Sequence, residues 1–351
     1  HTRYWRDWSS DVCSSDLGSN SFSSLTLAIG TTVLNGSNAA SGMINLGFKN
    51  FSNAVLRLAH TNGLNPEAVL MGPSGTSYVG TLDLAAGAGN YWVNAYGGGN
   101  MTFTNSSTNS ANLIFTNAIN TITSSSGTAG GKTLANNSSK LDIVFSNSVD
   151  IGSTGTNNGN ITFSGEGNFR LKGTVYNAGD ALRGVFKDGN GTLSFYTNNT
   201  YNGPTLVNNG TLEVSHPDGI PSSGVSNILT VGHGSKLKAN TNLTVGPMAI
   251  TNGGTLQMAL GTQITSGGAV DLSGATINLT GIPTADSYTL VTGTSVTAEA
   301  TNAPTLSAAI TGYSLVLEST SLKLQKIAGG SGFDSWASGY GLTGANAART
   351  T

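Results

Sequence analysis

The sequence predicts an all-β solenoid with irregular coils, and three observations support this prediction. Short segments alternate between apolar and polar residues, as strands with one buried face do. Turns rich in glycine and asparagine separate these segments. The glycines that open comparable strands recur at steps of 19, 24, 20 and 20 residues, at Gly191, Gly210, Gly234, Gly254 and Gly274. A period of about 20 residues indicates a solenoid, whereas a sandwich or an up-and-down barrel shows turns every 8–12 residues without this register.

The first 17 residues do not follow this pattern. They read HTRYWRDWSSDVCSSDL, and back-translation of residues 7–17 gives a string that resembles a short-read sequencing adapter. A signal peptide is the alternative, but it needs an apolar stretch of 7–15 residues that this segment lacks. We therefore interpret residues 1–17 as an unstructured, adapter-derived artefact. The only cysteine of the chain, Cys13, lies within it.

The composition restricts the classes of partner. Charged residues make up 9% of the chain, against about 25% in ordinary globular proteins. Without the first 17 residues, 17 − 3 = 14 acidic and 15 − 2 = 13 basic residues remain. A net charge near zero offers no attraction to nucleic acid or anionic lipid. No run of 18 apolar residues occurs, so no transmembrane helix is expected.

The expected strands run along most of the chain. Alternating segments predict strands at residues 113–115, 161–163, 192–195, 211–214, 255–258 and 276–279. Residues 54–59 also favour a strand. Residues 65–70 predict a short helix or helical turn over the solenoid, with Asn65 as its N-cap and Pro66 at the first position.

A single coil of this kind cannot be stable by itself. Ordering 20 residues costs about 20–40 kcal/mol of conformational entropy, whereas burying some five apolar side chains returns only about 1.5–3 kcal/mol each. The coils must therefore stack on their neighbours. Side-chain amides in asparagine runs such as 157–158 and 198–199 form ladders between coils or simply occupy turns. We expect the solenoid over residues 18–326, a flexible linker at 327–332, and the start of a further segment at 333–351.

One stretch of the chain resembles a known repeat. Residues 187–214 read KDGNGTLSFYTNNTYNGPTLVNNGTLEV, which is similar to the autotransporter-associated β-strand repeat. The positions that match its pattern are Gly189, Gly191, Thr192, Leu193, Asn199, Thr200, Tyr201, Gly203, Thr205, Val207, Gly210, Thr211, Leu212 and Val214. The resemblance implies a right-handed parallel β-helix in an exported passenger-type protein. It also implies a location outside the cell or on the surface, associated with the outer membrane of a Gram-negative-type bacterium.

The end of the chain carries a second, weaker resemblance. Residues 333–347 are similar to a stretch that precedes aspartate-rich calcium loops and a carboxy-terminal sorting signal in large exported bacterial proteins. This similarity leads us to expect a fragment that is truncated at both ends.

Catalytic and metal-binding groups are scattered in the sequence. A pectate-lyase-like β-helix would need several carboxylates for calcium beside a lysine or arginine base. The nearest group is Asp180, Arg183, Lys187 and Asp188, which we interpret as part of a solvated turn. Residues 188–191 predict a glycine-rich turn rather than a calcium loop. His216, Asp218 and His233 are expected to be polar loop residues, because a metal site would lack its third and fourth ligands.

The aromatic residues Tyr91, Trp92 and Tyr96 are weak candidates for a ligand surface. Exposed aromatic rings on a solenoid face could stack on sugar rings. They could equally pack a loop or an end of the solenoid, and packing is the interpretation that we favour.

The sequence thus leads to three hypotheses. The first is a structural or adhesive surface protein, a β-helix stalk or display surface that could bind glycans or cell-surface molecules through many weak contacts. The second is a polysaccharide-processing, lyase-like β-helix enzyme, and the third is a passive passenger stalk without a binding site. We favour the first hypothesis, and therefore expect a protein that is not an enzyme and needs no cofactor.

Overall fold

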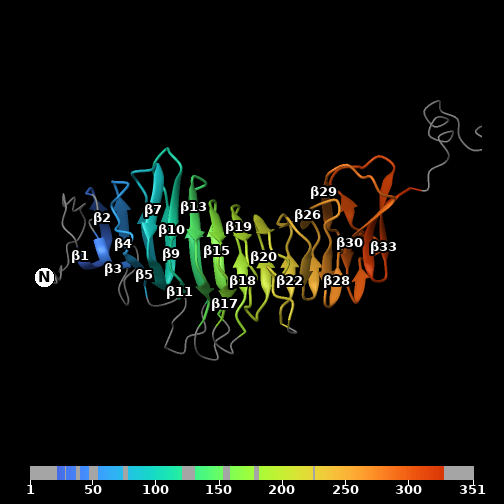
Figure 1. Cartoon of the computed structure of the whole chain (residues 1–351), viewed down its shortest axis with the longest axis horizontal. Helices are drawn as coiled ribbons and strands as arrows, with labels where there is room; N and C mark the ends of the chain where they lie inside the picture. The colour runs from blue at the N-terminus through green and yellow to red at the C-terminus, as the bar shows by residue number, and fades with distance from the viewer. Residues whose placement is uncertain are drawn as a thin grey trace, which may run out of the picture.

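The chain forms an elongated stack of β-coils. The computed structural model describes residues 22–27, 29–36, 40–46, 54–73, 78–120, 131–152, 159–177, 182–223 and 226–327. Figure 1 shows the strands following one another along the long axis from the N-terminus to the C-terminal strands. Within the described residues the secondary structure consists of strands and turns, and no helix occurs.

Two sheets run along most of this axis. The twelve-stranded sheet contains β2 (Gly30–Leu34), β4 (Ala54–Leu58), β6 (Val79–Asp83), β9 (Asn100–Thr104), β12 (Lys132–Asn136), β15 (Ile161–Gly165), β18 (Val185–Lys187), β20 (Thr205–Val207), β22 (Leu229–Val231), β25 (Met248–Ile250), β28 (Ala269–Asp271) and β31 (Ser295–Thr297). The ten-stranded sheet contains β7 (Gly89–Val93), β10 (Ala111–Phe115), β13 (Leu141–Phe145), β16 (Asn168–Leu171), β19 (Thr192–Phe195), β21 (Thr211–Val214), β23 (Lys236–Ala239), β26 (Thr255–Ala259), β29 (Thr276–Thr280) and β32 (Thr305–Leu306).

Two shorter sheets form the remaining side of the coils. The seven-stranded sheet contains β1 (Phe22–Leu27), β3 (Ala40–Leu46), β5 (Val69–Gly72), β8 (Ala95–Gly98), β11 (Ile119–Asn120), β14 (Val149–Asp150) and β17 (Val175–Tyr176). The five-stranded sheet contains β24 (Leu243–Val245), β27 (Ile264–Ser266), β30 (Ser287–Thr292), β34 (Ser321–Lys326) and β33 (Tyr313–Glu318).

The pairing of these strands defines a right-handed parallel β-helix, so the fold expected from the sequence is confirmed. A strand pairs with its counterpart one coil further on, as β13 does with β16 and β16 with β19. Parallel strands joined by crossovers of this length take the right-handed sense. The exceptions are β30–β34 and β33–β34, which pair antiparallel at the C-terminal end.

The register stacks equivalent side chains inside the solenoid. One inner row contains Leu113, Ile143, Phe169, Leu193, Leu212, Leu237, Leu256 and Ile277, each at most 1% exposed. Aromatic side chains from three of the sheets meet inside the N-terminal half of the solenoid. There Tyr96, Phe103, Phe115, Phe145, Phe163 and Phe169 form a column whose neighbouring ring centroids lie 5.0–6.5 Å apart. Such contacts between coils supply the stability that one coil lacks.

The third side of the solenoid is interrupted in the middle. The seven-stranded sheet ends at β17 and the five-stranded sheet begins at β24. Among the described residues between these strands, no strand occupies the third side. The coil of β18 and β19 and the coil of β20 and β21 therefore have two strands each, whereas their N-terminal neighbours have three.

Of the two forms expected at residues 65–70, a short helix or a helical turn, the structure contains only a turn, at residues 65–68. Asn65 does cap a turn, because its side-chain Oδ1 accepts a hydrogen bond from the Glu67 amide at 2.9 Å. The Ala68 amide donates to the Asn65 carbonyl at 2.9 Å, and the chain then enters β5. The inward-facing Leu70 pairs with β3 and β8. The hydrogen bonds between these parallel strands outweigh the local helix propensity of the segment. The strand expected at residues 54–59 is present as β4.

Other expectations fall on residues outside the described ranges. These are the adapter-derived residues 1–17, the asparagine pair at 157–158 and the segment at 333–351. Nearly all of the expected linker at 327–332 also lies outside them. The described part of the chain contains no helix that is long and apolar enough to cross a membrane.

Candidate functional site

The two-strand coils contain the residues that match the repeat pattern. Leu193 and Leu212 face inward in β19 and β21, next to each other in the register. Val207 in β20 and Val214 in β21 are buried as well. The apolar positions of the pattern are therefore the core of these two coils.

Two glycines of the pattern allow successive coils to approach closely. Gly210 has a φ of 69°, a left-handed conformation that side chains with a Cβ rarely adopt. A Cβ at Gly191 would lie 2.0 Å from the carbonyl oxygen of Gly167 in the preceding coil. Larger residues at these two positions would separate the stacked turns.

Asn199 connects three coils on the side that has no strand. Its buried side-chain Oδ1 accepts a hydrogen bond from the Val175 amide at 2.7 Å, and its Nδ2 donates to the Gly219 carbonyl at 2.6 Å. The backbone amide of Thr200 also donates to the Val175 carbonyl at 2.9 Å. The asparagine expected to form a ladder or a turn thus bonds to backbone groups of both neighbouring coils.

Backbone hydrogen bonds complete this connection as far as β24. The Asn199 amide donates to the Asp218 carbonyl at 3.0 Å, and the Thr244 amide donates to the Pro217 carbonyl at 2.9 Å. The third side is therefore hydrogen-bonded from β17 to β24, although no strand lies there among the described residues.

Tyr201 and Thr205 form a second internal polar contact in these coils. The Tyr201 hydroxyl lies 2.6 Å from Thr205 Oγ1, and both side chains are buried. Burial raises the pKa of Tyr201 well above its ordinary range. The contact satisfies two hydroxyl groups that would otherwise be buried without a partner.

The expectation that Lys187 belongs to a solvated turn is wrong. Lys187 faces inward and is 2% exposed. Its Nζ donates to the carbonyl oxygens of Asp188 at 2.6 Å, Gly189 at 2.6 Å and Asn209 at 3.3 Å. Burial lowers the pKa of Lys187 to about 8. The ammonium therefore holds the turn of one coil against the turn of the next.

The residues considered for lyase chemistry do not form a surface cluster. Arg183 is 5% exposed, and its Nη1 donates to the Gly159 carbonyl at 3.4 Å. Asp188 accepts hydrogen bonds from the Asn209 side chain and the Gly189 amide, which lower its pKa. Asp180 lies outside the described residues. Lys187 and Arg183 are thus structural cations inside the solenoid.

Two of the three residues considered as metal ligands, His216 and Asp218, are partners in a local hydrogen bond. Nδ1 of His216 accepts a hydrogen bond from the Asp218 amide at 3.1 Å. In the described ranges, no group of three or more histidine, cysteine, aspartate or glutamate residues could hold a metal ion.

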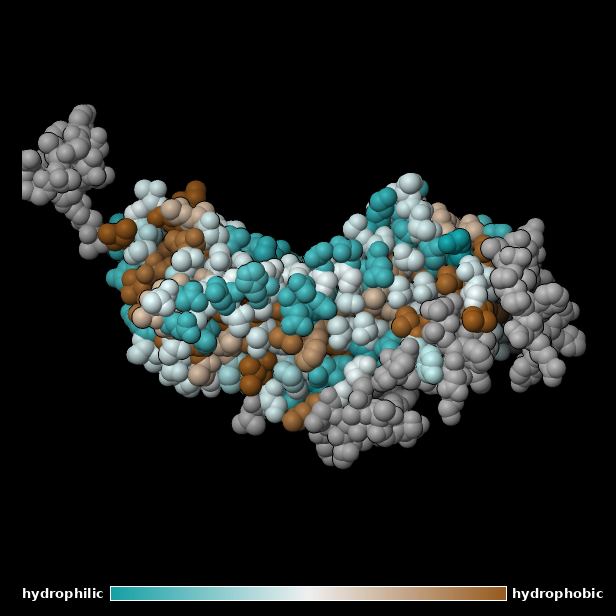
Figure 2. All heavy atoms as spheres, turned by 180° about the vertical axis from the view of Figure 1, so that it is seen from behind, coloured by the Kyte–Doolittle hydropathy of each residue, from teal (hydrophilic) through white to brown (hydrophobic). Residues whose placement is uncertain are grey.

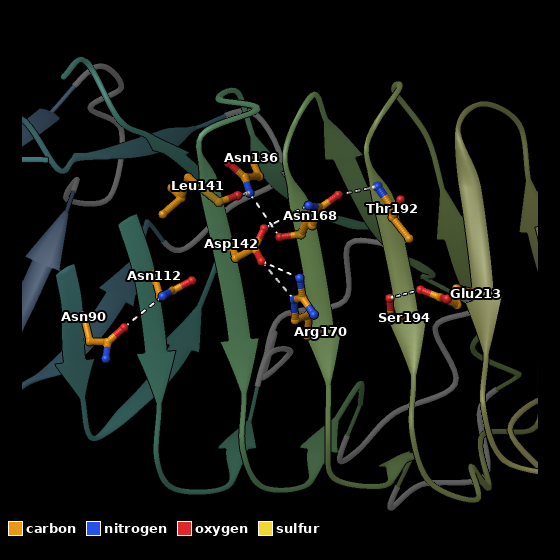
Figure 3. Close-up of polar contacts among 10 residues, drawn as sticks. All are labelled: Asn90, Asn112, Asn136, Leu141, Asp142, Asn168, Arg170, Thr192, Ser194 and Glu213. Atoms are coloured by element: carbon orange, nitrogen blue, oxygen red, sulfur yellow. Dashed lines mark hydrogen bonds and ion pairs between the residues drawn. The ribbon is translucent and has the colours of Figure 1, made fainter. Parts of the chain in front are cut away.

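The outer face of the ten-stranded sheet has rows of polar side chains that follow the strand register. Figure 3 shows Asn90 and Asn112 on neighbouring strands, where Asn112 Nδ2 donates to Asn90 Oδ1 at 2.8 Å. The row continues through Asp142 to Asn168, whose Nδ2 donates to Asp142 Oδ1 at 2.8 Å. Asn168 Oδ1 in turn accepts a hydrogen bond from the Thr192 amide at 3.1 Å.

Ion pairs on this face also connect successive coils. Arg170 donates to Asp142 through Nε at 2.9 Å and lies 2.7 Å from it through Nη2. Further along the axis, Lys238 Nζ lies 2.7 Å from Glu213 Oε1, and Ser194 Oγ donates to Glu213 Oε2 at 3.2 Å. These residues were not singled out from the sequence. Alignment of the strands at the coil period would have found them, because Arg170, Ser194, Glu213 and Lys238 share one register position and Asp142 lies two residues earlier on its strand.

The three aromatic candidates have different environments. Tyr91 and Tyr96 are 1% and 2% exposed, and their hydroxyls donate to the carbonyls of Gly87 and Gly99. They pack the core, in agreement with the favoured interpretation, so the weaker alternative of a ligand surface does not hold for these two residues. Trp92 points outward from β7 and is 45% exposed.

The fold and the internal polar contacts define the class of protein as a parallel β-helix with two central two-strand coils. Residues 185–214 match the model of the passenger-associated-transport-repeat. The match extends from β18 to β21, which are the two-strand coils, and it is consistent with the β-helix of an autotransporter passenger. The repeat points to exported passenger proteins and not to a known enzyme family. No curated protein and no solved structure matches the chain significantly.

Proposed function

We propose that this protein is a surface-displayed stalk of an exported bacterial passenger, with an outer face that makes adhesive contacts. The observation that carries the proposal is the passenger repeat at residues 185–214 within a stack of coils whose ten- and twelve-stranded parallel sheets continue through the repeat. The repeat supports export, and the stack supports a rigid, extended shape.

The internal structure suits a protein that works outside the cell. The strands of each coil form backbone hydrogen bonds with the strands of the coils on either side. The side chains that point into the solenoid are buried. A protease needs several residues of unpaired, extended chain, which a stacked coil exposes only after local opening. The stalk therefore resists cleavage without disulfide bonds.

The outer face supports the adhesive part of the proposal. Figure 2 shows hydrophilic residues over the middle of one face, whereas hydrophobic residues gather at the end that contains the C-terminal strands. The rows of amide, hydroxyl and paired ionic groups repeat at each strand spacing of about 4.8 Å. Repeated weak contacts of this kind add up to strong attachment when many are made at once.

The experiment that tests this proposal locates the protein on the cells that produce it. Antibodies raised against the purified chain are expected to label intact cells of the producing bacterium without permeabilisation. A periplasmic protein serves as the control and should be labelled only after permeabilisation. Labelling of the chain that also requires permeabilisation would contradict surface display.

A further inference from the structure

Trp92 lies on the outer face of the solenoid, and polar side chains surround it. Its indole is 45% exposed on β7, the first strand of the ten-stranded sheet. The register places Trp92 beside Ile114, Ile114 beside Val144, and Val144 beside Arg170. An exposed indole followed by a short apolar strip thus runs along the axis and ends at a guanidinium.

Two pairs of amide side chains border this strip. On one side Asn112 donates to Asn90 at 2.8 Å, two residues before Ile114 and Trp92 respectively. On the other side the Asn117 side chain donates to the Asn94 side chain at the corner after the strands. Residues two apart on a strand share a face, so Asn90 and Trp92 project together. Each pair fixes the orientation of its amides and leaves the other N–H and lone-pair positions available to a ligand.

The charge of this surface is balanced. Arg170 is the cation next to the strip, and its Nε and Nη2 both contact Asp142. The pair is partly open to solvent, with side-chain exposures of 42% and 23%. It therefore offers hydrogen-bond donors and acceptors without a net charge that would select an anion or a cation.

The amount of exposed apolar surface indicates the class of ligand. A stable protein partner usually buries about 800 Å² on each side around an apolar centre. Here Val144 is 8% exposed, and Trp92 is the large apolar side chain that stays open. A single aromatic platform surrounded by ordered amides suits a sugar ring instead, because its C–H face packs on the indole and its hydroxyls bond to the amides.

We propose that the surface formed by Trp92, Asn90, Asn112, Asn94 and Asn117, with the Asp142–Arg170 pair, binds a neutral polysaccharide. The chain of sugars lies along the solenoid axis, because the amide rows and the apolar strip both run from strand to strand in that direction. The proposal rests on the proposed function and names the ligand class of its adhesive face.

Affinity electrophoresis of the full chain tests this proposal. Gels contain hydroxyethylcellulose, galactomannan, xylan or the anionic polysaccharide alginate. At least one of the neutral polysaccharides is expected to retard the protein. Trp92→Ala should weaken that retardation about tenfold or more, the effect of losing an aromatic anchor. The double variant Asn90→Ala/Asn112→Ala should weaken it by a smaller factor.

A matched control separates the site from general surface effects. Ile282 is 87% exposed near the other end of the chain, so Ile282→Ala should leave the retardation unchanged. Circular dichroism checks that each variant keeps its β-structure. Two results would overturn the proposal: no retardation by any neutral polysaccharide, with or without retardation by alginate, or retardation that Trp92→Ala leaves intact.

The outcome of the affinity electrophoresis can be distinguished from the outcome of the surface-labelling experiment. Surface labelling together with failed polysaccharide binding overturns this site and leaves the stalk in place. Labelling that requires permeabilisation, together with Trp92-dependent binding, overturns surface display and leaves the site.

Discussion

The coils from β12 to β17 and the coils from β18 to β21 complete their third side in different ways. In the first group, β14 pairs with β17 through the backbone. In the second group, Asn199 bonds with its side chain to Val175 and Gly219. Both groups share the same inner row of apolar residues, from Ile143 to Leu212.

This difference shows where residue identity matters most. A backbone ladder forms with almost any side chain that fits the space, so the three-strand coils depend on the volume and polarity of their inner residues. The two-strand coils depend on particular polar groups, because only a carboxamide side chain offers both the carbonyl acceptor and the N–H donors that Asn199 uses. The match to the repeat family falls on the coils with these restricted positions.

The largest expected effect lies in the three-strand coils. Phe145→Ala should lower the free energy of unfolding by about 3–5 kcal/mol, because it leaves a cavity in the aromatic column. The Phe145 ring stacks on Phe115 at a centroid distance of 5.0 Å and contacts Phe163. Urea denaturation measures the loss, and hydrogen exchange should locate the faster opening in β10, β13 and β15. A loss below 1 kcal/mol would show that this column contributes little.

The second-largest effect tests the hydrogen bonds by which the Asn199 side chain connects neighbouring coils. Asn199→Ala should lower the free energy of unfolding by about 2–4 kcal/mol, since two buried backbone groups each lose a partner. Hydrogen exchange should become faster at Val175, in the coil before the substitution. The control is Asn112→Ala, which removes an amide pair from the surface and should cost less than about 0.5 kcal/mol. Equal losses for the two variants would contradict a special role of the two-strand coils.

The third effect is a dependence on pH. Burial lowers the pKa of Lys187 in the folded chain to about 8, from an ordinary value of 10.5. Between these two values the unfolded chain binds the proton that the folded chain has released, so stability should rise with pH. Denaturation at pH values from 7 to about 10.5 should show this rise in the natural chain relative to Lys187→Met. Parallel pH profiles for the two proteins would contradict the assignment.

The smallest effect is expected on the outer face. Lys238→Ala removes the ion pair with Glu213, whose side chains are 39% and 21% exposed. Such pairs contribute about 0–1 kcal/mol, and salt weakens them. Urea denaturation at low and high salt measures the loss. A loss of unfolding free energy as large as that of Asn199→Ala would mean that the polar rows on the outer face stabilise the coils as much as the buried hydrogen bonds of Asn199 do.

Much of the fold could be predicted from local patterns. The strands at residues 192–195 and 211–214 are present as β19 and β21, because alternation of apolar and polar residues is a property of the strand itself. The sequence left a short helix and a single turn open at residues 65–70, because an asparagine cap and a proline can begin either one. The position of Lys187 could not be predicted, since a lysine in an alternating segment is normally exposed.

By itself, the sequence determined that this protein is a solenoid of stacked coils and that its central coils carry the passenger repeat. Periodicity reports which side chains share a face, and glycine positions report where the chain turns. Only the tertiary structure decided which polar residues connect the coils, that Tyr91 and Tyr96 are buried, and that Trp92 is exposed. The physical reason is that hydrogen bonds such as those of Asn199 join residues 20 or more positions apart, and their geometry exists only once the coils have stacked.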